Sequence, residues 1–316
     1  MRIVFLGKQS VMTAIHWHIL GAGAMGCLWA AQLHRNHKPC TLLVRPAAAA
    51  GTPVLRLTEQ GQTWQLPVPI EDSSRPRRIT HLLLAVKAHQ TLAAVQMIKS
   101  QLNSDSCLVL LQNGMGSQQQ VTELCQNMAI YGAASTQGAR LIAPLHTQRA
   151  GHGLTWTGPF NQVAQQRGTS ALDDLTRLEG MEVRLQEDIH SRLLDKLAIN
   201  AAINAMTVLH DCSNGALLQA RHRDQLRSLC QETANILAAA QQQTPQTQAE
   251  PLLDSVLAVL ADTRDNLSSS LQDVRRGSPT ELRWINGWLL EQAARLGQPA
   301  PTHRALLDAL AAAGIQ

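Results

Sequence analysis

Short apolar runs recur along the first half of the chain, separated by turn residues or by stretches with helical spacing. They lie at 14–20, 40–44, 81–86, 107–112, 129–135, 153–158 and 181–185. Runs rich in Leu, Val and Ile that end at turn residues are typical of strands buried in a parallel sheet. Within 54–68, Gly61 separates two strand-like arms and predicts a hairpin. The pattern thus predicts alternating strands and helices.

From about residue 188 onward, the spacing of the apolar residues becomes helical. Stretches rich in Ala and Leu with this spacing lie at 190–210, 223–243, 282–297 and 303–314. The polar stretch 241–251, which contains two prolines, predicts a loop between helices. We therefore expect an α/β Rossmann-type N-terminal domain over residues 1–187, followed by an all-α C-terminal domain over residues 188–316.

Composition narrows the class of protein. Apolar residues make up 45% of the chain and charged residues 16%, which suits folded domains and excludes a disordered chain. The net charge of +4 is small and no dense basic run occurs, so we expect no nucleic-acid partner. No apolar stretch approaches the roughly 20 residues that span a bilayer. The six cysteines are scattered without a C-x-x-C pair, which predicts reduced thiols in a cytoplasmic protein and no metal site.

A glycine motif follows the first apolar run. Gly21, Gly23 and Gly26 form G-x-G-x-x-G between a predicted strand and a predicted helix. Such glycines permit a tight turn, close approach of a pyrophosphate, and close packing of helix on strand. The helix that follows would direct its first N–H groups at the phosphates. The motif predicts a dinucleotide site, and a glycine-rich turn without a ligand is the alternative.

Three further polar residues follow predicted strands. Arg45 stands where an NAD site usually carries an acidic residue, and it predicts NADP(H) through a contact with the 2′-phosphate. Lys87 follows 81–86, and Asn113 follows 107–112. Alone, each has an ordinary explanation: a solvated arginine, a helix start and an N-G turn. Because ligands bind beyond the carboxyl ends of parallel strands, we expect these residues and Gly21 at one rim.

A polar stripe runs along the predicted helix 190–210. Lys196, Asn200 and Asn204 are spaced four residues apart and share one face, while most of their neighbours are apolar. A helix that is apolar nearly all round is normally buried, and buried polar groups need partners. The stripe therefore predicts a site, with a structurally satisfied or narrow solvated face as the alternative.

A second polar group lies in the helical half. Ser269 and Asp273 are four residues apart on a predicted helix. Asp273 is also near Arg275 and Arg276, so a surface ion pair is an alternative. Glu281 ends the sequence Ser278-Pro279-Thr280-Glu281, which favours a capping box with proline at the first helical position.

Several segments together resemble the ketopantoate reductase (2-dehydropantoate 2-reductase) family from about Met12 to the C-terminus. They are ILGAGAMG, LLLAVKAHQ, LQNGMG, DKLAINAAINAMTVL and SSSLQDVRRGSPTELRWINGWLL, in this order. The resemblance implies NADPH-dependent reduction of ketopantoate to (R)-pantoate in pantothenate (vitamin B5) biosynthesis, on the coenzyme A pathway. It also implies a Rossmann domain and an all-α domain with the substrate between them.

The resemblance also implies roles for individual residues. Lys196 would be the catalytic acid, and Glu281 would be needed for activity rather than for capping alone. The residues implied for substrate are Asn113, Asn200, Asn204 and Ser269. Those expected at the cofactor are Gly21, Ala22, Gly23, Ala24, Met25, Gly26, Arg45, Lys87, Asn113 and Glu281.

Other functions stay open at this point. One is a related NADP-dependent 2-oxoacid or hydroxyacid dehydrogenase with another substrate, and another is a non-catalytic NADPH-binding regulator. The partner would be a small-molecule substrate, and the chain would be a monomer or a homodimer. Residues 1–11 precede the family-like segment, and we expect them to be a loose or non-native extension without a role in function.

Overall fold

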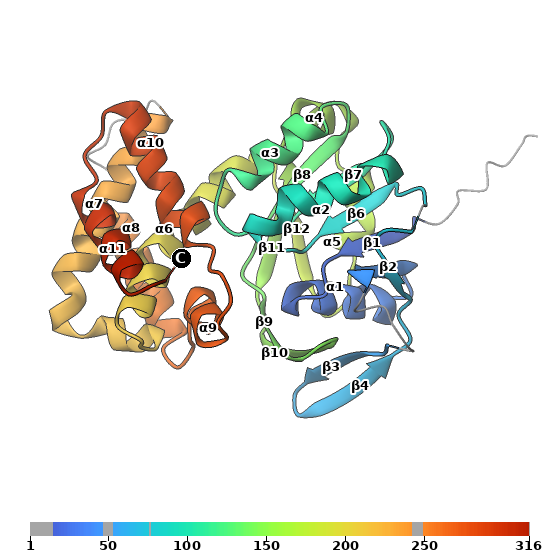
Figure 1. Cartoon of the computed structure of the whole chain (residues 1–316), viewed down its shortest axis with the longest axis horizontal. Coiled ribbons are helices and arrows are strands. Elements are labelled where there is room, and N and C mark those ends of the chain that lie inside the picture. Colours follow the sequence, from blue (N-terminus) through green and yellow to red (C-terminus); the bar gives the residue numbers. More distant parts are fainter. Residues whose placement is uncertain (1–14, 47–52, 76, 242–248, 316) are drawn as a thin grey trace, which may run out of the picture.

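A mostly parallel sheet between two layers of helices forms the first half of the molecule (Figure 1). The computed structural model describes residues 15–46, 53–75, 77–241 and 249–315. The sheet has eight strands in the order β12-β11-β8-β7-β6-β1-β2-β5. They are β1 (Trp17–Leu20), β2 (Cys40–Val44), β5 (Ile70–Asp72), β6 (His81–Leu84), β7 (Cys107–Leu110), β8 (Ala129–Ser135), β11 (Leu154–Pro159) and β12 (Glu182–Leu185). β11 is antiparallel to β8, and the pairs from β8 to β5 are parallel.

Alternate side chains of each central strand enter different cores. On β6, Leu83 joins the core that contains α1 (Ala24–Arg35), whereas Leu82 and Leu84 join the core with α2 (Thr91–Ile98) and α3 (Ser117–Leu124). Both faces are therefore buried, which explains why the strands appear in the sequence as unbroken apolar runs. Two shorter helices, α4 (Gln162–Arg167) and α5 (Asp173–Thr176), pack in the core that contains α1.

A second, four-stranded sheet has the order β4-β3-β10-β9. The predicted hairpin is confirmed: β3 (Leu55–Glu59) and β4 (Gln62–Leu66) are antiparallel and joined by Gln60 and Gly61, both with positive φ. A two-residue turn of this kind matches the twist of the strands. The strands β9 (Gly138–Ala143) and β10 (His146–Gly151) were not predicted from the sequence. Their pairing contains register shifts, and their polar residues hide the alternation expected of a strand.

Helices alone form the described part of the chain after β12, as the sequence predicted. They are α6 (Ile189–Leu209), two short 3-10 helices (Asn214–Leu218 and Ala220–His222), α7 (Arg223–Ala240), α8 (Ala249–Asp262), α9 (Ser269–Arg275), a π-helical turn (Arg283–Gly287), α10 (Trp288–Leu296) and α11 (Pro301–Ala312). The predicted loop 241–251 is wrong over 249–251, because α8 begins at Ala249 and accommodates Pro251 in its first turn. Residues 242–248 lie outside the described residues.

The strand ends meet the helical half on one side of the molecule (Figure 1). β7, β6, β1 and β2 are neighbours in the sheet, so the residues beyond their carboxyl ends share one rim. The first part of α6 packs in the core of α2 and α3, which brings its polar stripe toward that rim. The predicted extension 1–11 lies outside the described residues. Within the described ranges, no helix is both long and apolar enough to cross a membrane.

Candidate active site

The glycine turn between β1 and α1 is shaped by close backbone packing. Gly21 has φ of +112°, and a Cβ there would lie 2.8 Å from Val86 Cγ1. At Gly26, a Cβ would lie only 1.8 Å from the carbonyl oxygen of Gly21. Neither position tolerates a side chain without movement of the backbone. The first and third glycines of the motif are therefore required by the fold itself.

Gly23 differs, because a Cβ there would meet only the Ala85 carbonyl oxygen, at 4.0 Å. The space beside Gly23 is open, and no side chain of that residue can cap α1. The first turn of α1 carries no acidic residue. Its backbone N–H groups are thus available to an anion, and Ala24 is the first helical residue. Ala22 and Met25 pack against the core beneath. The turn fits the pyrophosphate of a dinucleotide.

Arg45 follows the last residue of β2 and its side chain is exposed. It stands one residue beyond the strand that neighbours β1. An exposed guanidinium at this edge can reach a phosphate on the ribose of a nucleotide seated on the glycine turn.

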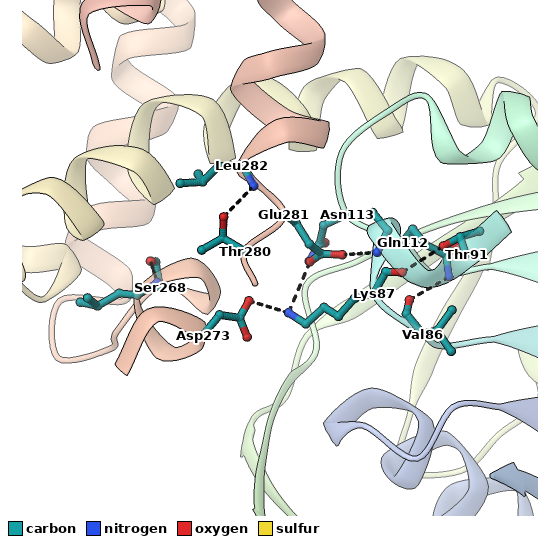
Figure 2. A network of polar contacts seen from close by, with 12 residues as sticks. Val86, Lys87, Thr91, Gln112, Asn113, Ser268, Asp273, Thr280, Glu281 and Leu282 are labelled. Atoms are coloured by element: carbon teal, nitrogen blue, oxygen red, sulfur yellow. Dashed lines mark hydrogen bonds and ion pairs between the residues drawn. The ribbon is translucent and has the colours of Figure 1, made fainter. Parts of the chain in front are cut away.

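Lys87 connects the two halves of the molecule (Figure 2). Its Nζ lies 2.8 Å from Asp273 Oδ2 and 3.5 Å from Glu281 Oε2, both in the helical half. Burial works to lower the pKa of Lys87, but the charges of Glu281 and Asp273 outweigh it and the pKa is raised. The lysine therefore stays an ammonium, and 38% of its side chain remains exposed to a ligand.

Glu281 accepts hydrogen bonds from two loops of the sheet domain. Its Oε1 accepts the Ala88 N–H at 2.9 Å, and its Oε2 accepts the Asn113 Nδ2–H at 3.0 Å (Figure 2). The side chain is buried. The capping box expected at Ser278–Glu281 is wrong, because the helix begins at Leu282, whose N–H donates to Thr280 Oγ1 instead. The carboxylate joins the two halves of the molecule rather than capping its own helix.

Lys196 lies in the first half of α6, beside the buried Leu193 and Leu197, and is itself half-buried. Burial lowers the pKa of Lys196 to about 8, and the charge of Glu281 opposes part of that lowering. The two side chains form no ion pair in the described part of the chain, so Glu281 acts on Lys196 through its field and does not hold it by contact. A lysine with a pKa near neutrality can both carry and release a proton.

The rest of the polar stripe continues along α6. Asn204 is only 4% exposed, and its Nδ2 has no hydrogen-bond partner among the described residues. Asn200 is half-buried. Buried amide donors are rarely left unpaired, so the Asn204 Nδ2 points to a ligand oxygen or a water. Ser269 is exposed at the first position of α9.

Asp273, to which the sequence analysis assigned no role in the site, contacts a residue of the site. Asp273 was open to interpretation as a surface ion pair with its neighbouring arginines. In the structure it is buried and pairs with Lys87 across the two halves. Burial raises the pKa of Asp273, against the lowering effect of the Lys87 ammonium. In the sequence, the spacing of four residues between Ser269 and Asp273 was the signal that both side chains lie on one face of a helix.

The described residues contain no cluster of His, Cys, Asp or Glu suited to a metal ion.

Solved structures with the same fold cover nearly the whole chain. D-mandelate dehydrogenase in a ternary complex with NADH and anilino(oxo)acetate superposes with a TM-score of 0.84 at 20% identity, over 94% of this chain and 98% of that one. The probable 2-dehydropantoate 2-reductase of Bacillus subtilis superposes with a TM-score of 0.79 at 24% identity, over 94% and 99%. These matches establish the Rossmann-type domain followed by a helical domain.

Sequence comparison is more specific than the fold. Residues 17–162 match the family described as "Ketopantoate reductase PanE/ApbA", and residues 188–314 match its C-terminal part. The 2-dehydropantoate 2-reductase of Vibrio cholerae is 31% identical over 290 residues, 91% of this chain and 94% of that protein. The enzyme of the same name from Yersinia pestis is 30% identical over 295 residues, 92% of each. The chain belongs to the ketopantoate reductase family of oxidoreductases.

Proposed function

We propose that the chain reduces ketopantoate to (R)-pantoate with NADPH, as a step of pantothenate biosynthesis. The observation that carries the proposal is the lysine of lowered pKa on α6, in one polar stripe with the unpaired Asn204 amide. Residues 1–187 would hold the cofactor, and residues 188–316 would supply the acid and most of the substrate contacts. One structural neighbour, from Staphylococcus aureus, is named a dimeric ketopantoate reductase, and we expect this chain to be a monomer or a homodimer.

Reduction of a ketone needs a hydride at the carbonyl carbon and a proton at the oxygen. NADPH, when bound, supplies the hydride. The Lys196 ammonium donates a hydrogen bond to the ketone oxygen, stabilises the negative charge that grows there, and transfers its proton to it. Proton transfer by a positioned acid typically contributes about 10²–10⁴-fold. A cation in a water-poor site adds electrostatic stabilisation of the alkoxide.

The remaining polar residues orient the two ligands. Asn200, Asn204 and Ser269 carry donors suited to the carboxylate and hydroxyl oxygens of a small keto acid. Asn113, held by Glu281 at 3.0 Å, follows β7 at the rim that also carries the glycine turn. Lys87, which stays charged, suits an anionic group of cofactor or substrate. Holding the ketone in reach of the nicotinamide is an orientation effect, and small displacements are costly.

Replacement of Lys196 by alanine tests the acid. We expect Lys196→Ala to lower kcat about 10²–10⁴-fold in an NADPH oxidation assay with ketopantoate at 340 nm, because the alkoxide loses its proposed proton donor. The Kd for NADPH, measured by fluorescence titration, should change little. Lys38→Ala is the matched control, since Lys38 pairs with Asp174 away from this site. A Lys196→Ala protein with normal kcat would refute the assignment.

The pKa of Lys196 predicts the pH dependence of the reduction. The acid must be protonated, so kcat/KM should be constant below about pH 8 and fall as the pH rises through the pKa of about 8. Well above that value, the decline should approach about tenfold per pH unit. The measurement is kcat/KM for ketopantoate at saturating NADPH across this range. A flat profile through about pH 10 would contradict the role of Lys196 as the acid.

Replacement of Arg45 tests the preference for NADPH over NADH. We expect Arg45→Asp to raise the KM for NADPH about ten- to a hundredfold, because it replaces a charge-assisted hydrogen bond to the 2′-phosphate with repulsion. The KM for NADH should stay the same or fall. Arg78→Asp, at an exposed arginine paired with Asp105, makes the same change of charge elsewhere and serves as the control. An unchanged KM for NADPH would remove the basis for NADP(H) preference.

Substitutions at Gly26 and Gly23 test folding and cofactor binding separately. Gly26→Ala forces a Cβ against the Gly21 carbonyl and should lower the melting temperature by several degrees, about 5 °C or more. Gly23→Ala meets open space and should leave the melting temperature unchanged while weakening NADPH binding, because its methyl group occupies the path of the pyrophosphate. Thermal denaturation and NADPH titration of both variants provide the comparison. Normal NADPH affinity in Gly23→Ala would place the dinucleotide elsewhere.

A further inference from the structure

The short helix α9 carries two groups of the site. Ser269 is its first residue, and Asp273, one turn later, pairs with Lys87. α9 has seven residues, and a helix of that length is not stable by itself. Its position must therefore be fixed by contacts with neighbouring elements.

A chain of hydrogen bonds ties the start of α9 to α6. The Leu271 N–H donates to Ser268 Oγ at 3.1 Å, which caps α9. Ser268 Oγ lies 2.7 Å from Thr207 Oγ1, and the Thr207 hydroxyl donates to the carbonyl of Asn204 at 2.9 Å. Because the Thr207 proton is used on that carbonyl, Ser268 is the donor to Thr207. Both hydroxyl groups are buried and each donates once.

Thr207 continues the polar stripe of α6 by one more turn. Lys196, Asn200, Asn204 and Thr207 follow at intervals of four, four and three residues, so they lie along one face. The first three are the proposed acid and substrate contacts. The fourth binds Ser268, the residue directly before Ser269. The stripe thus ends in a bond that sets the distance between the amides of α6 and the serine of α9.

We propose that Thr207 is a positioning residue for the substrate. Its hydrogen bond to Ser268 holds the Ser269 hydroxyl at a fixed place opposite Asn200 and Asn204, so that one small keto acid contacts both helices at once. Thr207 itself is fully buried, and its hydroxyl bonds to Ser268 and to the Asn204 carbonyl. This inference rests on the proposed function, because it names what aligns the contacts of that site.

The test replaces the hydroxyl by a methyl group of similar size. We expect Thr207→Val to raise the KM for ketopantoate about tenfold, because the Ser268 donor loses its acceptor and the start of α9 moves. kcat should change less than about threefold, since Lys196 lies eleven residues away on the same rigid helix. The Kd for NADPH should stay within about twofold, because the glycine turn belongs to the other domain.

Two further variants separate positioning from general stability. Thr207→Ser keeps the hydroxyl and should restore the KM of the unmodified protein. Thr155→Val removes a buried hydroxyl that lies 2.8 Å from Ser135 Oγ in the large sheet, a matched Thr–Ser pair that is not part of the polar stripe. It should lower the melting temperature as Thr207→Val does and leave the KM unchanged. Hydrogen exchange gives a readout without substrate: amides of 268–275 should exchange faster in Thr207→Val only.

The outcomes distinguish the two proposals. If the unmodified protein does not oxidise NADPH with ketopantoate, the proposed function fails, and faster exchange at 268–275 still supports the anchoring of α9. If it does turn over ketopantoate and Thr207→Val has a normal KM, the positioning role of Thr207 is overturned. An equal rise of KM in Thr207→Ser would also overturn it, because packing rather than the hydroxyl would be responsible. Should Thr207→Val not fold, Thr207→Ala removes the same hydroxyl, keeps the Ser268 cap of α9 and gives the same readouts.

Discussion

The buried carboxylate of Glu281 is the contact on which the arrangement of the two halves depends. A carboxylate removed from water is costly unless hydrogen bonds and a cation replace its hydration. Among the described residues, the direct contacts come from the sheet domain: the Ala88 N–H, the Asn113 amide and the Lys87 ammonium. These partners lie beyond the ends of β6 and β7. The helical half therefore satisfies its buried charge only when it docks at the rim where ligands of this fold bind.

The close packing of the two halves also explains why a glycine, Gly114, stands in the loop after β7. Gly114 has φ of +79°, and a Cβ there would lie 2.2 Å from the carbonyl oxygen of Trp284, in the π-helical turn. The next residue, Met115, donates its N–H to that carbonyl at 2.9 Å. The Asn113-Gly114 pair therefore does more than form a turn in the chain. It lets the loop lie against the other half closely enough for Asn113 to reach Glu281.

The sequence predicted those features that depend on neighbours along the chain. Buried strands, the hairpin at Gly61 and the stripe on α6 follow from periodicities of two and of about 3.6 residues, and the structure confirms them as elements. The partners of Glu281 do not follow from any local pattern, because Ala88 is 193 residues away. Local reasoning gave that glutamate a capping role, and tertiary contact decided otherwise. β9 and β10 were missed for a similar reason, since their irregular pairing is visible only across strands.

The surroundings of Lys87 and Lys196 shift the pKa values of the two lysines in opposite directions. Burial lowers the pKa of Lys196 to about 8, whereas Glu281 and Asp273 outweigh burial at Lys87 and raise its pKa. Groups whose environments separate their pKa values take different roles in acid–base chemistry. A lysine that remains charged at every working pH is suited to holding an anion, and one that titrates near neutrality is suited to giving up a proton. Glu281 is common to both lysines, in contact with Lys87 and acting on Lys196 only through its field. This contrast supports the proposal that α6 supplies the proton and that the sheet rim binds an anion.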